Sequence, residues 1–114
     1  MSIKKYTEDR PWGKFEQFIH NEQSTVKIIT VKAGEELSLQ THTKRDEFWR
    51  ILKGPIEITT ENGPIVAQEG DEFFVKRGDK HRMKGLDNEG QVLEIALGDF
   101  DEQDIVRLED KYHR

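Results

Sequence analysis

Short apolar or β-branched runs recur about every ten residues along the chain, and turn residues separate them. Many short strands at even spacing are typical of β-sandwiches and barrels. The pattern predicts strands over residues 13–19, 25–31, 36–42, 47–52, 56–60, 65–67, 72–75, 81–83 and 91–97. Asn62-Gly63 lies between two of these runs and predicts a hairpin with a type I′ turn, which needs positive φ at both central residues.

One stretch, residues 101–111, has helical spacing instead, with Ile105, Leu108 and Tyr112 recurring on one face. Asp99 or Asp101 is placed to cap its start. We therefore predict an all-β protein, a small barrel or jelly roll, with a short C-terminal helix. Since the chain has 114 residues and a mass of 13.4 kDa, we expect residues 1–114 to form a single domain.

Composition and charge exclude several classes of function. The chain has 18 basic and 23 acidic residues, a net charge of −5, which disfavours binding to nucleic acids and anionic membranes. No apolar run approaches the ~20 residues of a membrane span, and no apolar signal core follows Met1. Without cysteine the chain has no disulfide and no thiolate nucleophile. We expect a cytoplasmic protein with neither nucleic-acid nor membrane partners.

Four residues have the chemistry of metal ligands: Gln40, His42, Glu47 and His81. Alternate residues of a strand face the same side, so Gln40 and His42 point together. Glu47 opens the next predicted strand, and closure of a barrel can bring His81 near. An amide oxygen, two imidazoles and a carboxylate suit Zn, Mn, Fe, Co or Ni. By spacing alone, separate surface positions for these groups remain the alternative.

The spacing of these residues resembles the two cupin motifs, Gly34-x5-Gln40-Thr41-His42-x4-Glu47-x6-Gly54 and Gly70-x7-Gly78-x2-His81. The resemblance is closer still to the cupin domain of bacterial type II mannose-6-phosphate isomerases, which also forms the C-terminal part of bifunctional mannose-1-phosphate guanylyltransferases. It extends from Arg10 to Arg114 and includes three further stretches: Arg10-Pro11-Trp12-Gly13, Leu37-Ser38-Leu39 with Arg45 and Trp49, and Asp104-Ile105-Val106-Arg107-Leu108-Glu109-Asp110.

This resemblance implies a fold, a cofactor and an activity. The fold is a cupin-type double-stranded β-helix, a jelly-roll barrel. The cofactor is a divalent metal held by Gln40, His42, Glu47 and His81, with Zn expected first and Mn, Co, Fe or Ni as alternatives. The activity is interconversion of the hexose phosphates mannose 6-phosphate and fructose 6-phosphate through a cis-enediol. Small cupins commonly dimerise, so a homodimer is expected.

Four positions depart from the patterns of these families. Lys44 replaces a second histidine that is common in cupins, and Phe48 replaces a histidine that is common in type II isomerases. Lys76 and His113 stand where a proline and a glycine are expected. The first two departures flank the metal site, so they bear on substrate choice and catalytic competence.

A basic strip surrounds His81 and predicts a phosphate pocket, although a solvated loop would have the same composition: Lys76, Arg77, Lys80, Arg82 and Lys84. Because arginine can grip a phosphate with two parallel hydrogen bonds, Arg77, Arg82 and Arg45 are candidates for substrate binding. Arg50 and Arg107 are further candidates that the sequence does not rank.

Two other roles have candidates. Trp12 and Trp49 are expected in the core or the pocket wall, and stacking on a sugar face is the alternative role for both. Trp49 is the candidate for substrate binding. The candidate general bases are Glu94, if burial raises the pKa of its carboxyl group, and Lys44.

Functions of other classes compete with the isomerase. The domain could bind a sugar phosphate or a metal without chemistry, or it could be another metal-dependent cupin enzyme such as an oxygenase. Pyrophosphorylase activity is not expected of these residues, because they contain no glycine-rich nucleotide loop.

Overall fold

The computed structural model describes residues 3–99, 101 and 103–110. Within this part of the chain there are eleven strands and no helix, so the predicted all-β class is confirmed. The strands are β1 (Tyr6–Arg10), β2 (Gly13–Gln17), β3 (Ser24–Val31), β4 (Leu39–Thr41), β5 (Arg45–Lys53), β6 (Ile56–Thr60), β7 (Gly63–Ala67), β8 (Glu72–Val75), β9 (Arg82–Gly85), β10 (Gly90–Gly98) and β11 (Val106–Glu109). With no helix there, nothing in the described part has the length and apolar character of a membrane-crossing helix.

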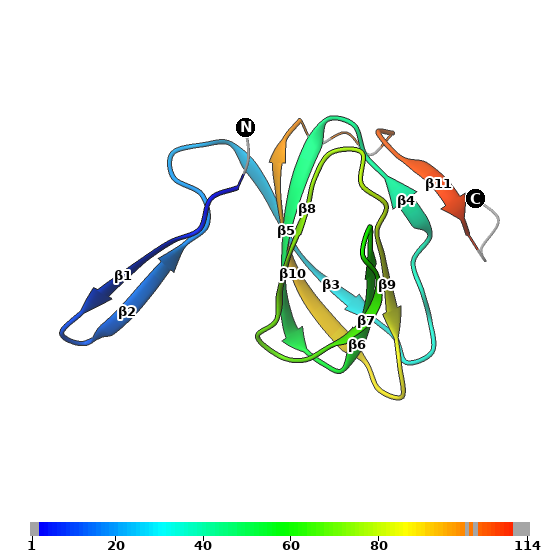
Figure 1. Cartoon of the computed structure of the whole chain (residues 1–114), viewed down its shortest axis with the longest axis horizontal. Coiled ribbons are helices and arrows are strands. Elements are labelled where there is room, and N and C mark those ends of the chain that lie inside the picture. The colour runs from blue at the N-terminus through cyan, green and yellow to red at the C-terminus, as the bar shows by residue number, and fades with distance from the viewer. Residues whose placement is uncertain (1–2, 100, 102, 111–114) are drawn as a thin grey trace.

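Two layers of strands face each other, as in a jelly roll (Figure 1). The first layer has the strand order β3-β10-β5-β8, and the second is built on β7-β6-β9. Isolated bridges from Glu36 to Lys84 and from Gln40 to His81 place the segment around β4 beside β9, and β11 pairs with β4. Among the described residues the pairings do not close into a ring, so β3 and β11 remain end strands of the two layers.

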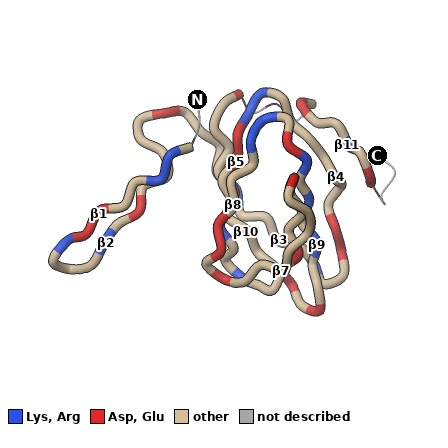
Figure 2. Tube along the Cα trace, in the orientation of Figure 1, with Lys and Arg blue, Asp and Glu red and all other residues tan. Residues whose placement is uncertain are grey.

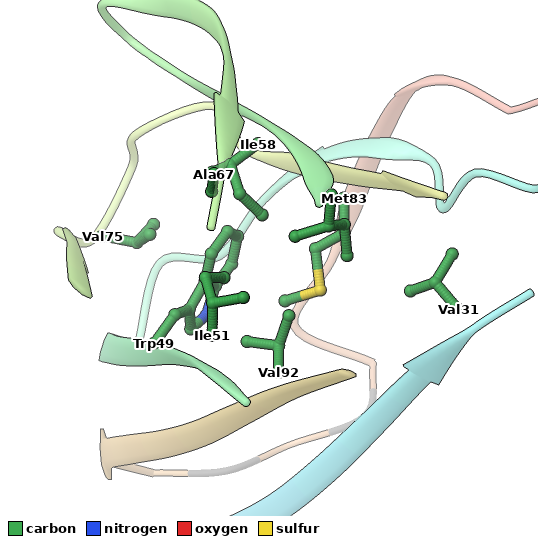
Figure 3. Close-up of a cluster of buried hydrophobic side chains, with 9 residues drawn as sticks. Val31, Trp49, Ile51, Ile58, Ala67, Val75, Met83 and Val92 are labelled. Atoms are coloured by element: carbon green, nitrogen blue, oxygen red, sulfur yellow. The ribbon is translucent and has the colours of Figure 1, made fainter. Parts of the chain in front are cut away.

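An apolar core fills the space between the layers, with Trp49, Ile51, Met83 and Val92 at its centre (Figure 3). Alternation along β5 and β10 directs every second side chain inward. Continuing the same inward rows from Ile51 and Val92 leads to polar groups, Glu47 on β5 and Glu94 on β10. The packing of the core therefore fixes where these two carboxyl groups lie.

The N-terminal strands form a hairpin that projects away from the two layers (Figure 1). Strand β1 pairs antiparallel with β2, and only the second was predicted. Trp12, in the turn between them, is 73% exposed, so its predicted place in the core or pocket wall is wrong. The residues that follow the hairpin, Phe18 and Ile19, pack against Phe48 on the outer face of the first layer.

The predicted C-terminal helix is wrong for the described part of residues 101–111. Strand β11 occupies residues 106–109 and pairs antiparallel with β4. Leu108 is 47% exposed and Val106 is 54% exposed, so no buried apolar stripe exists to favour a helix. Strand β4 instead offers backbone partners to this segment. Tyr112 lies outside the described residues.

The predicted hairpin between β6 and β7 is confirmed, but its turn is not of type I′. Thr60 pairs with Gly63, so Glu61 and Asn62 form the turn. Of Asn62 and Gly63, only the glycine has positive φ, at 92°. Gly63 thus adopts a left-handed backbone conformation at the start of β7. This conformation is free of strain for a residue without a side chain.

Candidate metal centre

His42, Glu47 and His81 converge between the two layers. One ligand atom of each lies within 4.8 Å of the others, and all three side chains are buried. His42 directly follows β4 and Glu47 lies in β5, so the turn between these strands sets their separation, 3.6 Å between His42 Nε2 and Glu47 Oε2. His81 joins them because its backbone exchanges two 3.1 Å hydrogen bonds with that of Gln40. The two distant motifs thus meet in one group of a kind that binds divalent metals.

Both imidazoles are held in the tautomer that a metal ligand needs. His42 Nδ1 donates to the backbone oxygen of Asp104 at 2.6 Å, and His81 Nδ1 donates to that of Asp79 at 3.1 Å. Because a carbonyl oxygen only accepts, the ring hydrogen of each histidine sits on Nδ1 and the Nε2 lone pair is left for a ligand. Such a hydrogen bond behind the ring is typical of metal-binding histidines.

Arg45 provides the positive charge between the ligand atoms in this structure. Its Nε donates to Glu47 Oε2 at 2.9 Å, and its Nη2 donates to His42 Nε2 at 3.0 Å. Trp49 Nε1 donates to the other carboxylate oxygen of Glu47, also at 2.9 Å. The donor atoms fit a divalent cation, but a cation that binds His42 Nε2 and Glu47 Oε2 must displace the arginine from both.

Gln40 is the fourth predicted ligand, and its side chain lines the same cavity. Its Nε2 donates to the backbone oxygen of Ser38 at 3.4 Å, which leaves the amide oxygen, the atom with metal affinity, available. Ser38 is only 1% exposed, and its hydroxyl group has no hydrogen-bond partner in the described part of the chain. Buried polar groups are rarely unpaired, so this cavity is built to receive a polar ligand.

Two neighbouring carboxyl groups share one proton at this site. Burial raises the pKa of Glu94 to about 8, and the hydrogen bond and charge of Glu47 act in the same direction. Burial also opposes ionisation of Glu47, but hydrogen bonds from Glu94, Arg45 and Trp49 lower its pKa to about 2. The proton therefore resides on Glu94. Burial lowers the pKa of His81, which favours the neutral ring that binds a metal.

The cavity beside these groups has a volume of about 290 Å³. Such a volume suits a small ligand. The predicted ligands His42 and His81, the predicted base Glu94 and the aromatic ring of Trp49 line it. Arg45 and Arg82, two of the predicted phosphate-binding arginines, also reach its wall.

Arg82 is already engaged by the neighbouring strands. Its Nε donates to the backbone oxygen of Leu37 at 3.0 Å, and its Nη1 lies 3.3 Å from a carboxylate oxygen of Glu109. The side chain thus links β9 to β11 across the cavity wall.

The structure does not bring Arg77 and Lys44 into this cavity. Figure 2 shows basic residues along the loop from β8 to β9, but Arg77 pairs with Asp46 at 3.4 Å in a separate hollow. Lys44 lines that hollow too, half-exposed, with its Nζ 3.7 Å from Asp101. Only part of the basic strip therefore faces the candidate metal centre.

Sequence reasoning missed two residues of this site and left a third unranked. Lys27 on β3 and Arg107 on β11 both line the cavity, and Asp104 orients His42. Arg107 was an unranked candidate. Lys27 could have been found from the alternation of its strand, but only once the inward-facing row of that strand was known. Asp104 belongs to a stretch that resembles the isomerase family, but no role was predicted for it, because it orients His42 through its backbone oxygen.

Comparisons with known proteins bear on the identity of the chain. The sequence profile of the family described as "Mannose-6-phosphate isomerase C-terminal" matches residues 2–110. The chain is 36% identical to mannose-1-phosphate guanylyltransferase ManC of Salmonella typhimurium and to xanthan biosynthesis protein XanB of Xanthomonas campestris, each over 92% of its length. It spans only 22% and 23% of the length of those two proteins.

A solved structure supports the same assignment at the level of the fold. The sugar phosphate isomerase from a cupin superfamily of Silicibacter pomeroyi superimposes with a TM-score of 0.63 and 18% identity. The match covers 76% of this chain and 69% of the other. With the predicted cupin motifs, the jelly-roll layers and a profile match over nearly all of its length, this chain belongs to the mannose-6-phosphate isomerase C-terminal family and has the cupin fold.

Proposed function

We propose that this domain is a metal-dependent sugar-phosphate isomerase that interconverts mannose 6-phosphate and fructose 6-phosphate through a cis-enediol. One observation carries the proposal: His42, Glu47 and His81 converge beside a cavity that the two histidines line, and Glu94 lies in the wall of the same cavity. The family description supports the substrate class. The similar proteins ManC and XanB are much longer chains, and ManC is named for guanylyl transfer, so the isomerase assignment rests on the domain itself.

The ligands would be His42, Glu47, His81 and Gln40, with Zn expected first and Mn, Co, Fe or Ni as alternatives. When bound, a divalent ion supplies Lewis-acid stabilisation of negative charge on the substrate oxygens at C1 and C2. Arg45 would give up its two contacts to the ligand atoms and remain close by as a second positive charge.

Glu94 is the group we propose to move the proton between C2 and C1. It lies on the inward row of β10, directly between Lys27 on β3 and Trp49 on β5, and it faces the cavity. Glu94 can take a proton from one carbon and return it to the next once its own proton has left. A divalent cation held by Glu47 would favour that ionised form, because it would offset the negative charge of Glu47 that raises the pKa of Glu94. Lys44, the other predicted base, is half-exposed outside the cavity, which favours Glu94.

The test is turnover by the purified chain loaded with zinc, manganese or cobalt. Mannose 6-phosphate is expected to yield fructose 6-phosphate, and His42→Ala or His81→Ala should abolish this. His20→Ala is the matched control, because His20 is exposed and contacts Asn21 only at the surface. If calorimetry detects binding of hexose phosphate but no turnover occurs, the domain is a binding module and not an isomerase. Oxygen consumption that requires iron would instead identify an oxygenase.

The remaining expectations concern assembly and location. The single-domain organisation of residues 1–114, the homodimer and the cytoplasmic compartment remain predictions. Sedimentation of the purified chain would test the dimer, whose expected mass is twice 13.4 kDa.

A further inference from the structure

The end strands of both layers help to line the cavity. β3 ends the first layer and β11 ends the second, and each contributes residues to the cavity wall. Lys27 on β3 lies directly opposite Glu94 on β10, and Arg107 on β11 lies opposite Gln40 on β4. Since directly opposed residues project from the same face of a sheet, both positive side chains share the face that lines the cavity.

We infer that Lys27 and Arg107 form a clamp for the phosphate group of a sugar phosphate at the mouth of this cavity. The inference rests on the proposed function, because it takes the same cavity as the substrate site. It adds two residues that bind the substrate without taking part in the chemistry.

The other arginines of the cavity wall already have partners. Arg45 donates to Glu47 and His42, and Arg82 donates to the Leu37 backbone and pairs with Glu109. Arg107, by contrast, is exposed, and its side chain has no hydrogen bond or ion pair within residues 3–99, 101 and 103–110. Its guanidinium group is thus available to bind two oxygens of one phosphate.

The charge of the cavity wall favours a dianion. Four cationic side chains line it, from Lys27, Arg45, Arg82 and Arg107, and Glu94 is the single carboxyl group in the lining among the described residues. Glu47 offsets the charge of Arg45 and Glu109 that of Arg82, so the excess positive charge comes from Lys27 and Arg107. A positive cavity in a chain of net charge −5 concentrates anions where the rest of the surface repels them.

The position of the phosphate on the substrate explains how this clamp would assist the reaction. In a hexose 6-phosphate the phosphate is at the opposite end of the carbon chain from C1 and C2. If Lys27 and Arg107 hold that end at the mouth, the reacting carbons extend inward toward His42, His81 and Glu94. Fixing one end of the substrate in this way converts binding energy into orientation at the other end.

Calorimetry on the zinc-loaded chain with mannose 6-phosphate tests the clamp. Arg107→Gln and Lys27→Met are each expected to weaken binding about tenfold, as removal of a charge-assisted hydrogen bond does. The zinc dissociation constant should not change, which shows that the site remains folded. Arg107→Lys keeps the positive charge but loses the two parallel N–H donors of the guanidinium group. Its affinity for mannose 6-phosphate should lie between those of wild type and Arg107→Gln.

The matched controls are Arg10→Gln on the projecting hairpin and Lys53→Met, which pairs with Glu89 at the surface. Both should bind mannose 6-phosphate as wild type does. Wild-type affinity in Arg107→Gln and Lys27→Met would overturn the clamp, as would the absence of any hexose-phosphate binding by the wild type. Binding that depends on these residues without turnover would keep the clamp and overturn only the isomerase.

Discussion

The ring of His42 donates its Nδ1 hydrogen to the backbone oxygen of Asp104, 2.6 Å away and 62 residues further along the chain. The carboxylate of Asp104 accepts hydrogen bonds from the backbone of Thr43 at 2.9 Å and of Lys44 at 2.8 Å. The Thr43 hydroxyl group donates to the same carboxylate at 2.7 Å. One residue thus orients the histidine and fixes the turn that joins it to Glu47.

Asp104→Ala is therefore expected to weaken metal binding as well as the fold. Loss of its hydrogen bonds to the turn should lower the free energy of unfolding by about 1–2 kcal/mol. Freed from the turn, the Asp104 carbonyl would orient His42 less well, so zinc affinity should fall at least about tenfold. Calorimetry with zinc and urea unfolding measure the two effects. Asp87→Ala, at an exposed position, is the control, and an unchanged zinc affinity in Asp104→Ala would contradict the prediction.

The shared proton of Glu47 and Glu94 predicts a pH dependence of stability in chain treated with a chelator. In the unfolded chain Glu94 ionises near its ordinary pKa of 4.5, whereas burial in the folded chain raises this pKa to about 8. Between these two pH values Glu94 has lost its proton in the unfolded chain and keeps it in the folded chain. Glu94 therefore makes the free energy of unfolding fall as the pH rises from about 4.5 to about 8.

Urea unfolding at several pH values within this window measures the slope. Glu94→Gln should remove this fall, because an amide does not titrate. The lowered pKa of His81 would then make the free energy of unfolding of this variant rise with pH in part of the window. Glu57→Gln replaces a glutamate of β6 that lies outside the cavity, and it should keep the slope of the wild type. An equal slope in Glu94→Gln and wild type would show that another group is responsible.

Arg45 holds the two atoms to which a metal ion at this site would bind. Arg45→Met removes the guanidinium group from His42 Nε2 and Glu47 Oε2, so zinc affinity is expected to rise about tenfold. Without zinc the variant should be less stable than wild type, because the buried carboxylate of Glu47 loses its cationic partner. The increase in melting temperature on adding zinc should therefore be larger in the variant than in wild type.

Arg50→Met is the control for this experiment. Arg50 pairs with Glu16 and Glu72 rather than with the metal ligands, so its removal should leave zinc affinity as it is. Weaker zinc binding in Arg45→Met than in wild type would mean that the arginine supports the site instead of competing for it.

Local patterns in the sequence were enough to predict most strands, because alternation and turn residues are set within a few positions. Two strands, β1 and β11, were not predicted, because they lack a buried apolar face. The sequence of β1 is largely polar and its side chains are exposed, while β11 exposes Val106 and Leu108. The periodicity of apolar residues identifies a strand by its buried face, so it gives no signal for a strand with two exposed faces.

The candidate ligands could be predicted because their spacing lies within two short motifs. The contacts made by the residues around these ligands could not be predicted. Arg45 meets His42 and Glu47 through its rotamer, Lys27 faces the cavity through the register of β3 on β10, and Asp104 acts through its backbone. Each depends on how distant segments pack, which no local pattern in one sequence specifies.

Gly98, the last residue of β10, packs against the turn that carries Arg45. A side chain at this position would bring its Cβ within 2.5 Å of the Lys44 backbone oxygen, and the φ of 124° disfavours any residue but glycine. Gly98→Ala is therefore expected to lower the free energy of unfolding by about 2–4 kcal/mol through strain and overpacking. Because relief of the clash displaces Lys44 and Arg45, zinc affinity should change as well.

Gly63→Ala separates the two causes. Gly63 also has positive φ, at 92°, but nothing lies within 4 Å of a Cβ placed there. Its replacement should lower the free energy of unfolding by about 1 kcal/mol through backbone strain alone, with no effect on zinc binding. Thermal unfolding and zinc titration of both variants make the comparison. Equal losses of stability with unchanged zinc affinity would show that the backbone around Lys44 yields to a methyl group without moving the metal centre.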